Sequence, residues 1–233
     1  VSTSGKNSAV LGASDSYANA GVVDSWGTEV GADYTKKIGD IKFNLGAKFT
    51  LSKNKIIEQF ESPKAYDYLR STGKSIGQIF ALQAIGYFVD QADINSSPTQ
   101  QFGQVKPGDI KYKDINNDKV INNNDFIPMG YNSTAILNTT SVYRPLVGDA
   151  TISNYYYANR WTPENPNSRF PRLTTESVDN NLKNSSVWLA DRSFLKLRNC
   201  EIYYKLPSSF LDKIKMKTAK IYVRGIDLLC FDS

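Results

Sequence analysis

The sequence predicts an all-β fold, and three observations carry this prediction. Apolar and polar residues alternate with a period of two along several segments, the pattern of strands with two unlike faces. The clearest such segment, residues 41–52, continues for twelve residues, whereas strands of soluble proteins average about 5–6. Long polar stretches punctuated by Gly and Pro separate the alternating segments. No apolar segment of the chain approaches the roughly 20 residues of a membrane helix.

Residues 24–53 are expected to form an antiparallel hairpin with a short turn at 35–40. In its first strand Trp26, Val30 and Tyr34 share a face, opposite Gly and acidic residues. The apolar face of its second strand consists of Ile41, Phe43, Leu45, Ala47, Phe49 and Leu51. One apolar face opposite a small or polar face suits a membrane barrel with lipid outside and a wet lumen inside. A long hairpin in a soluble sandwich fits the alternation equally well.

Residues 54–187 are expected to be mainly loops, because Pro and Gly interrupt every short apolar stretch. A second hairpin is predicted over 193–231, although Lys196 and Arg198 interrupt the apolar face of its first strand. In this hairpin Cys200 and Cys230 should lie about seven residues apart, too far for the roughly 7 Å reach of a disulfide.

The sharpest local motif is the Asn/Asp-rich loop 114–125. Oxygen-bearing groups recur at loop positions one, three, five, seven, nine and twelve, the spacing with which a loop wraps a calcium ion. The candidate ligands are Asp114, Asn116, Asp118, the backbone carbonyl of Val120, Asn122 and Asp125. Lys119 stands where the sharp turn favours Gly, with a strain of about 1 kcal/mol if its φ is positive. An Asn/Asp-rich turn stabilised by its own side chains is the alternative.

Other functions find little support in the composition. The chain has no histidine, which removes the commonest general base and the commonest zinc ligand, so no enzyme is expected. Its net charge of +5 is a mild excess, and no run of basic residues longer than two occurs outside the scattered Lys213, Lys215, Lys217 and Lys220, so no nucleic-acid partner is expected either. Tyr155, Tyr157 and Trp161 are candidates for stacking on a sugar or peptide substrate, but a place at the membrane interface or packing under a loop is the commoner role of such aromatic residues.

Phrases distributed along the chain resemble SusC/RagA-type TonB-linked outer-membrane proteins of Bacteroidetes. Each phrase is short, and their joint order is specific. They are Trp26-Gly27-Thr28-Glu29-Val30, Lys53-Asn54-Lys55-Ile56, Gly73-Lys74-Ser75-Ile76-Gly77-Gln78, Gly86-Tyr87-Phe88, Pro107-Gly108-Asp109-Ile110-Lys111-Tyr112-Lys113-Asp114, Arg160-Trp161-Thr162-Pro163-Glu164-Asn165-Pro166-Asn167, Phe170-Pro171-Arg172-Leu173, Trp188-Leu189-Ala190-Asp191-Arg192-Ser193-Phe194-Leu195-Lys196-Leu197-Arg198-Asn199 and Tyr204-Lys205-Leu206-Pro207.

The resemblance implies part of a large antiparallel transmembrane β-barrel, 22-stranded in the family, with long extracellular loops. It also implies an outer-membrane location in a Gram-negative cell, a plug inside the barrel and a SusD-like surface lipoprotein that closes over it as a lid. Such proteins import oligosaccharides or peptides with energy from the TonB complex. A soluble calcium-dependent glycan-binding β-domain is the alternative function.

The resemblance also sets an extent and a topology. We expect residues 1–233 to be a partial barrel that lacks the plug, the TonB-contacting segment and the final strands. Between Gly130 and Arg160, where the family usually fits further strands, only 29 residues lie here. Short turns face the periplasm in such barrels. The strand after the 35–40 turn then runs outward and the strand from 193 inward, so zero or two membrane strands lie between them. Residues 131–158 are the expected place for any such strands.

Overall fold

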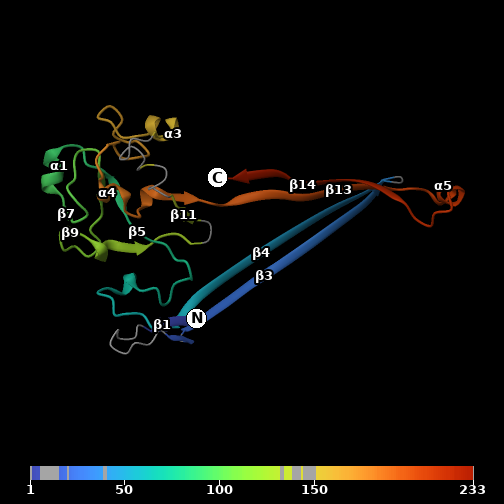
Figure 1. Cartoon of the computed structure of the whole chain (residues 1–233), viewed down its shortest axis with the longest axis horizontal. Coiled ribbons are helices and arrows are strands. Elements are labelled where there is room, and N and C mark those ends of the chain that lie inside the picture. The colour runs from blue at the N-terminus through green and yellow to red at the C-terminus, as the bar shows by residue number, and fades with distance from the viewer. Residues whose placement is uncertain are drawn as a thin grey trace. The chain divides into compact units, whose positions relative to one another are not determined.

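The chain divides into two compact units (Figure 1). The computed structural model describes residues 2–5, 16–19, 21–38, 41–131, 134–137, 143 and 151–232, without the side chains of 2–5, 16–19, 41–47, 195–200 and 232. The strand unit comprises Ser25–Asn54 and Arg192–Ser233, and the loop unit comprises Val1–Asp24 and Lys55–Asp191.

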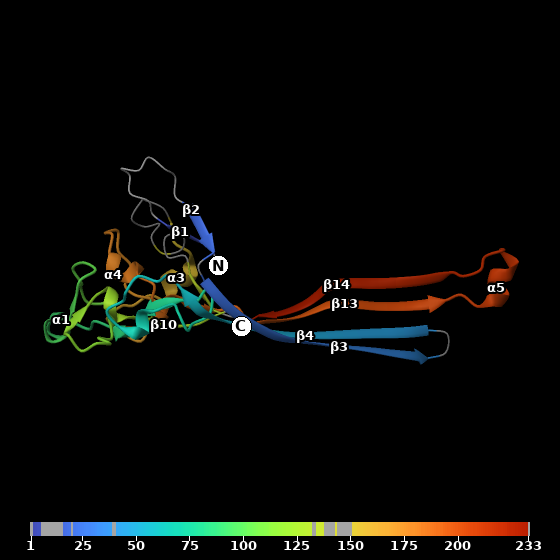
Figure 2. The ribbon, with the colours of Figure 1, turned by 90° about the horizontal axis from the view of Figure 1, so that it is seen from below.

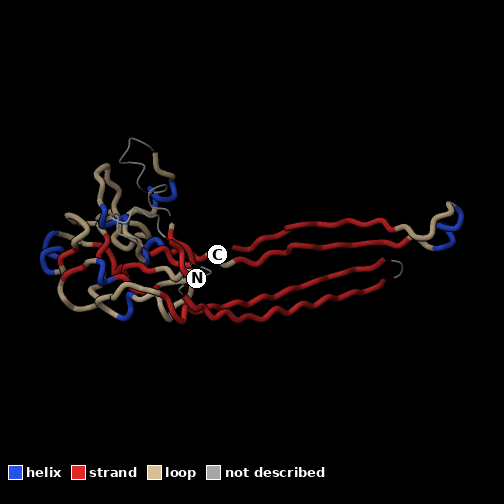
Figure 3. Tube along the Cα trace, turned by 60° about the horizontal axis from the view of Figure 1, so that its bottom comes forward, coloured by secondary structure: helices blue, strands red, loops and turns tan. Residues whose placement is uncertain are grey.

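The strand unit is a four-stranded sheet in the order β14-β13-β4-β3, in which the strands run side by side (Figures 2 and 3). β3 spans Gly21–Ile38 with 18 residues and β4 spans Ile41–Gln59 with 19. β13 spans Phe194–Lys205 and β14 spans Lys220–Asp232. The all-β prediction is therefore confirmed. β3 and β4 are longer than the alternation indicated, because their outer ends carry mixed polar residues without a clean period of two.

The four strands share one mainly apolar and one mainly polar face, and Tyr222 and Ile226 are exposed exceptions that the register places on the polar face. The register pairs Ile202 with Val223 and with Phe43, and paired residues of antiparallel strands point to the same face. On the other face Glu201 accepts a hydrogen bond of 2.8 Å from Nε of Arg224. The apolar side chains described as exposed on the first face are Trp26, Val30, Tyr34, Ile38, Phe49, Leu51, Ile202, Ile221 and Val223. The side chains of Ile41, Phe43, Leu45 and Ala47 lie outside the described ones.

The first hairpin shows the same division into two faces. The Nζ atom of Lys53 lies 5.6 Å from the ring centroid of Trp26, so these two residues share the apolar face. The side chains of Glu29 and Lys48 approach to 4.0 Å on the polar face. Gly27 lies close to β4, since a Cβ atom on Gly27 would come within 2.6 Å of the carbonyl oxygen of Leu51.

A β-bulge interrupts the second hairpin. The register shifts between Leu197 and Asn199, and Asp227 in β14 takes a φ of 50°. Cys230 therefore pairs with Lys196 and Cys200 with Gly225, four positions apart along β13 rather than about seven. At roughly 3.3 Å per residue this is still about 13 Å, beyond disulfide reach. Cys230 is a free, exposed thiol.

β4 pairs directly with β13 in antiparallel fashion, Tyr204 facing Ile41. Among the described residues between these two strands, no strand is longer than the four residues of β6 (Ala84–Tyr87). The two hairpins are therefore neighbours in the sheet, and the zero-strand alternative of the topology prediction agrees with this pairing.

The loop unit is built from short elements instead of the separate loops that the sequence suggested. Its small two-stranded sheets pair β1 with β2, β5 with β10, β6 with β8, β7 with β9 and β11 with β12. The remaining strands are β1 (Ser2–Gly5), β2 (Ser16–Asn19), β5 (Phe80–Leu82), β7 (Thr99–Gln100), β8 (Ile110–Tyr112), β9 (Val120–Ile121), β10 (Phe126–Pro128), β11 (Thr134–Ile136) and β12 (Leu189–Asp191). The helices are η2 (Asp67–Leu69), α1 (Gln91–Ser96), η3 (Asn123–Asp125), α3 (Asn154–Ala158), α4 (Asp179–Leu182) and η5 (Ser186–Trp188).

An aromatic core holds these elements together. Trp188, which is fully buried, stacks on Phe170 with ring centroids 5.7 Å apart and meets Tyr143 at 5.1 Å. The buried cluster consists of Leu82, Ile110, Tyr112, Ile121, Tyr143, Phe170, Val187 and Trp188. Strands of two to four residues are too short for a recognisable period, which explains why the sequence indicated only loops here.

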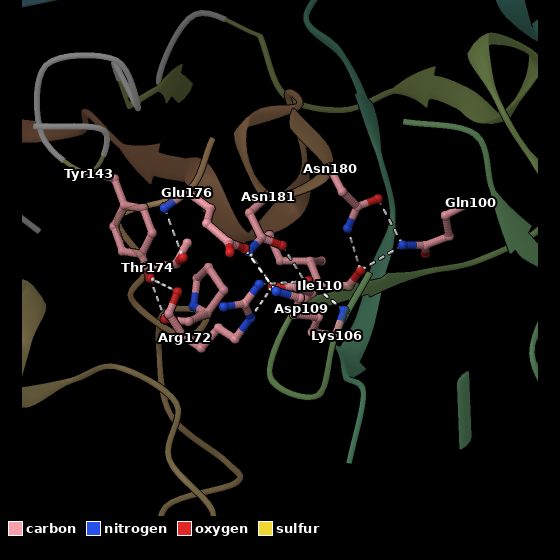
Figure 4. A network of polar contacts seen from close by, with 11 residues as sticks. Gln100, Lys106, Asp109, Ile110, Tyr143, Arg172, Thr174, Glu176, Asn180 and Asn181 are labelled. Atoms are coloured by element: carbon pink, nitrogen blue, oxygen red, sulfur yellow. Dashed lines mark hydrogen bonds and ion pairs between the residues drawn. The ribbon is translucent and has the colours of Figure 1, made fainter. Parts of the chain in front are cut away.

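A buried polar network crosses this core (Figure 4). The carboxylate of Asp109, fully buried, accepts hydrogen bonds from Nε and Nη2 of Arg172 at 2.7 and 3.3 Å. It also accepts one from Nδ2 of Asn181 at 2.8 Å and one from the backbone N–H of Lys106 at 2.7 Å. Gln100 extends the network, donating to Oδ1 of Asn180 at 2.8 Å. The network joins residues 100–112 to residues 172–181, which lie some 70 positions later in the sequence.

Replacing Asp109 with Asn should lower the free energy of unfolding of the loop unit by about 3–5 kcal/mol. The change leaves the Arg172 guanidinium buried without a counter-charge. The measurement is hydrogen exchange at the amides of Ile110 and Tyr112 in the intact protein. Glu176→Gln is the matched control: Glu176 forms an exposed ion pair with Lys106 at 2.8 Å, so its loss should change exchange little. Equal protection in both variants would show that the network does not hold the unit together.

Candidate functional site

The Asn/Asp-rich loop 114–125 folds around its own carboxylates. Asp114 accepts hydrogen bonds from the backbone N–H groups of Asn117 at 2.7 Å and Lys119 at 2.8 Å. Asp118 accepts one from the backbone N–H of Val120 at 2.8 Å and one from Nδ2 of Asn116, also at 2.8 Å. These are the contacts of an Asn/Asp-rich turn, and they hold each oxygen in a defined orientation.

Two residues of this loop adopt the left-handed conformation. Lys119 has a φ of 65° and Asn117 a φ of 60°. Asn tolerates this region, whereas Lys is strained there by about 1 kcal/mol. The sequence analysis predicted this strain at the position where calcium-binding loops place Gly.

Asp125 closes the loop from inside. Its side chain is fully buried, and its two oxygens accept hydrogen bonds from the backbone N–H groups of Ile115 and Asn122, both at 2.8 Å. Asn122 in turn accepts one from the N–H of Asn124 at 2.7 Å, which completes a capping box at the start of η3. Asp125 therefore acts as a cap in this structure.

Two tyrosines support the loop from a distant part of the sequence. The hydroxyl of Tyr68 donates a hydrogen bond to the carbonyl of Asn124 at 2.6 Å, and the Tyr66 hydroxyl accepts one from Nδ2 of Asn116 at 3.0 Å. Their rings stack with centroids 5.2 Å apart. Burial raises the pKa of Tyr68, and the negative charge of Asp125 raises it further. The carboxylates of the loop therefore act on this hydroxyl from close range.

The loop suits a hard cation by its donor chemistry but not by the present placement of its carboxylates. No Lys or Arg nitrogen of the described residues lies within 4.0 Å of a carboxylate oxygen of Asp114, Asp118 or Asp125. The Val120 carbonyl is on the edge of β9 that faces away from β7, because the carbonyls on either side of it accept from Thr99 and Gln101. Within the described part of the chain, however, no three His, Cys, Asp or Glu side chains lie close enough together to hold a metal ion.

Glu61 clamps the segment that carries the two tyrosines. Its carboxylate accepts hydrogen bonds from the backbone N–H groups of Ser71 at 2.8 Å and Thr72 at 3.1 Å, and from the Thr72 hydroxyl at 2.9 Å. Burial opposes ionisation of Glu61, but these hydrogen bonds outweigh it and lower the pKa of this carboxyl from 4.5 to about 2. The clamp therefore depends on the charged form.

The depressed pKa of Glu61 predicts a loss of local stability in acid. The clamp contributes fully above the unfolded pKa near 4.5, and its contribution disappears as the pH falls from about 5 to about 2. We expect the loss to be about 2 kcal/mol after allowance for partial exposure of the side chain. Hydrogen exchange at the Ser71 and Thr72 amides across this range is the measurement. Exchange is expressed as a protection factor relative to the intrinsic rate at each pH. Glu61→Gln should have low protection factors throughout; a pH dependence of the protection factor that survives in this variant would assign the effect to another group.

The aromatic candidates do not form one stacking platform. Trp161 is only 9% exposed and packs against Gly108, so it belongs to the interior of the loop unit. The Arg160 guanidinium covers the ring of Tyr157 at 3.8 Å from the centroid. Tyr155 is 61% exposed and meets Phe170 edge-on at 5.7 Å. Of the three candidates, only Tyr155 presents an uncovered, exposed ring among the contacts of the described residues.

A groove beside α1 was missed by the sequence analysis. It has a volume of about 740 Å³, and its lining carries no charged side chain. The lining residues are Phe88, Gln91, Ile94, Asn95, Ser97, Pro98, Thr99, Gln100, Gln101, Gly103, Gln104 and Val105. The available signal was the recurrence of Asn and Gln without Asp, Glu, Lys or Arg over 94–105. Amide and hydroxyl groups of this kind suit a neutral, hydrogen-bonding ligand.

Comparison with known proteins shows similarity to TonB-dependent receptors. No family model matches the chain. TonB-dependent receptor P26 of Formosa agariphila is 27% identical over 91% of this chain, and the match covers 25% of that receptor. TonB-dependent receptor P3 of the same organism is 30% identical over 66% of the chain and 14% of the receptor. The chain thus spans a quarter or less of the length of these relatives.

Solved structures agree in fold. The RagAB peptide importer in its open-open state matches all of this chain with a TM-score of 0.60 and 15% identity, over 28% of its own chain. The RagAB peptide transporter matches 97% of this chain with a TM-score of 0.59 and 15% identity, over 27% of its own.

The two-faced antiparallel sheet has the fold of part of the barrel of the RagAB transporter. In sequence the chain is similar to TonB-dependent receptors over the part of their length that it spans. These relatives are named as receptors and transporters. None of the described helices is long and apolar enough to cross a membrane.

Proposed function

We propose that this chain forms part of the wall and surface loops of an outer-membrane receptor that imports oligosaccharides or peptides with a SusD-like lipoprotein. The observation that carries the proposal is the sheet with one apolar and one polar face. Exposed apolar side chains such as Val30, Phe49 and Val223 would be costly in water over so large an area, whereas lipid contact explains them. The similarity to TonB-dependent receptors supports the same assignment.

We assign each part a side of the membrane from the lengths of the connections. β3 and β4 are joined by a short turn, whereas the long part of the loop unit, up to Asp191, follows β4. Barrels of this kind place short turns in the periplasm and long connections outside. The loop unit is then extracellular, where its neutral groove and Tyr155 are available to a substrate and to the lipoprotein.

Thiol labelling on whole cells tests this topology. In the full-length protein with Cys200 and Cys230 replaced by Ser, an impermeant thiol reagent should label Asn123→Cys and leave Lys37→Cys unlabelled. Both side chains are exposed, so burial cannot cause the difference. After permeabilisation both should react equally.

The opposite labelling pattern would reverse the sidedness of every binding surface in the proposal. Equal labelling of both variants on intact cells would argue against a membrane wall altogether and favour a soluble binding domain. The same cells, supplied with labelled peptides or oligosaccharides, should accumulate one class only when the gene is present. Absence of uptake of either class would refute the transport function.

We further propose that the loop 114–125 holds one calcium ion. The support is its oxygen donor set, the absence among the described residues of an ion-pair partner within 4.0 Å of its carboxylates, and the Val120 carbonyl that faces away from β7. Asp114, Asn116, Asp118, Val120 and Asn122 would provide ligands, and Asp125 would keep the loop closed or join them. Calcium prefers 6–8 oxygen ligands, so the carboxylates would exchange some of their backbone hydrogen bonds for the ion. Bound calcium would make this extracellular loop rigid.

The double variant Asp114→Ala/Asp118→Ala should abolish calcium binding and increase hydrogen exchange over residues 109–127, without loss of the barrel. Isothermal calorimetry of the full-length protein with calcium chloride is the measurement. Asn123→Ala is the control, since its exposed side chain is outside the donor set. No heat of binding to the wild-type protein at millimolar calcium would refute the site.

A further inference from the structure

The connection between β13 and β14 carries a concentration of positive charge. Residues 205–220, termed here the lysine tip, contain five lysines and one acidic residue, Asp212, so that 5 − 1 gives a net charge of +4. The lysines are Lys205, Lys213, Lys215, Lys217 and Lys220. Among the described residues no acidic oxygen lies within 4.0 Å of Lys213, Lys215 or Lys217, which are exposed. The whole-chain excess is +5, so most of it is concentrated here.

Exposed apolar side chains alternate with these lysines. Phe210, Ile214 and Met216 are each between 45% and 49% exposed. A soluble surface turn rarely presents three large apolar side chains within seven residues. Phe, Ile and Met beside Lys is the composition of segments that lie in the headgroup region of a membrane.

The lysine tip is a folded structure rather than a loose loop. The helix α5 (Ser208–Lys213) ends in a Schellman motif, in which the N–H of Met216 bonds to the carbonyl of Leu211 at 3.0 Å and the N–H of Lys215 to that of Asp212 at 3.3 Å. Leu211 is buried, and the N–H of Leu206 closes the tip on the carbonyl of Ala219 at 3.1 Å. The lysines are therefore presented from a defined scaffold.

Lys215 occupies a position that favours a different residue. Its φ of 56° is in the left-handed region, and the corresponding position of this motif is usually Gly. A lysine there is strained, because its Cβ crowds the following carbonyl oxygen. Such a strained residue indicates that its side chain serves a purpose other than the fold.

The apolar face of the sheet begins directly beside the lysine tip. Ile221 follows Lys220 and is 63% exposed, and the register places Tyr204 opposite it. The first hairpin ends at the same end of the sheet, with exposed Lys36 and Lys37 near the close of β3 (Figure 3). The positive charge thus lies where an apolar band meets water, which is the level of lipid phosphates.

We propose that the lysine tip binds the phosphates of anionic glycerophospholipids, such as phosphatidylglycerol, in the periplasmic leaflet. Lys213, Lys215 and Lys217 contact the headgroups, while Phe210, Ile214 and Met216 enter the boundary with the acyl chains. The partner is a phospholipid and not a soluble polyanion, because the lysines alternate with exposed apolar side chains. This inference rests on the proposed function, since it requires the sheet to span the membrane.

Native mass spectrometry of the full-length receptor, titrated with phosphatidylglycerol or phosphatidylcholine in detergent, tests the inference. The wild-type protein should prefer phosphatidylglycerol, and each lysine removed should reduce this preference about fivefold. Lys213→Gln/Lys215→Gln/Lys217→Gln should lose it by about a hundredfold. Lys64→Gln/Lys106→Gln/Lys113→Gln, which removes the same charge from exposed positions of the loop unit, is the control and should keep it.

Lys215→Gly separates binding from folding. Gly adopts a positive φ without strain, so the tip should be at least as well folded, yet the preference should fall about fivefold. Unchanged preference in both the triple variant and Lys215→Gly would overturn the proposal.

Lysine-dependent binding of lipopolysaccharide without binding of phosphatidylglycerol would assign the tip to the opposite leaflet and equally overturn it. Failure of the transport proposal itself appears separately, as reversed or equal thiol labelling of Asn123→Cys and Lys37→Cys.

Discussion

The buried carboxylate of Asp109 is the constraint on which the loop unit depends. An ionised carboxylate away from water is tolerated only when its charge and its oxygens are matched, and here Arg172, Asn181 and the Lys106 amide do so together. Arg172 and Asn181 come from a segment 63 and 72 positions later in the sequence, so each of the two segments depends on the other. Gly108 adds a steric condition: with a φ of 87° and the Trp161 ring 2.4 Å from where a Cβ would lie, only Gly fits there. The unit therefore folds as one body, although its strands have only two to four residues.

The strand unit depends on a different constraint, and this difference determines what the sequence predicted. Alternation is a local property of the sequence. The two faces of a hairpin such as 24–53 can therefore be predicted without knowing which strands pair with it. Gln100, Asn180 and Asn181 have no such signal. As isolated residues they are typical of polar loops, yet they are almost completely buried. The amides of Asn180 and Asn181 satisfy backbone groups of Ile110, 70 and 71 residues away, and the amide of Gln100 satisfies those of Ile110 and Tyr112. The sequence thus predicted the two hairpins of the sheet. It did not predict that residues 54–187 contain short strands and helices around a buried core.

The candidate site divides in the same way. The spacing of Asp114, Asp118 and Asp125 predicted a calcium-binding loop, with an Asn/Asp-rich turn stabilised by its own side chains as the alternative. The hydrogen bonds of Asp114 and Asp118 to backbone N–H groups are those of such a turn. The same spacing does not predict how many carboxylate oxygens accept hydrogen bonds from backbone N–H groups. Both oxygens of Asp125 do so. The support from Tyr68 lies 56 positions away from Asn124 and had no local signal. Trp161 agrees with the alternative that the sequence left open, packing under a loop, because it is buried against Gly108.

The order of the units along the chain explains how wall and loops can change independently. β4 and β13 pair directly, although the loop unit intervenes between them in the sequence. The entropy lost on closing a connection increases only slowly with the length of the connection. A connection that has its own core is also ordered in the folded state. The wall requires little more than a period of two, which many sequences satisfy, and this agrees with a shared fold at 15% identity. The loop unit instead requires specific partners such as Asp109 and Arg172, so its framework is constrained while its exposed groove and loop 114–125 remain open to variation. Differences in what such receptors bind should therefore be concentrated in exposed residues of the loop unit and not in the sheet.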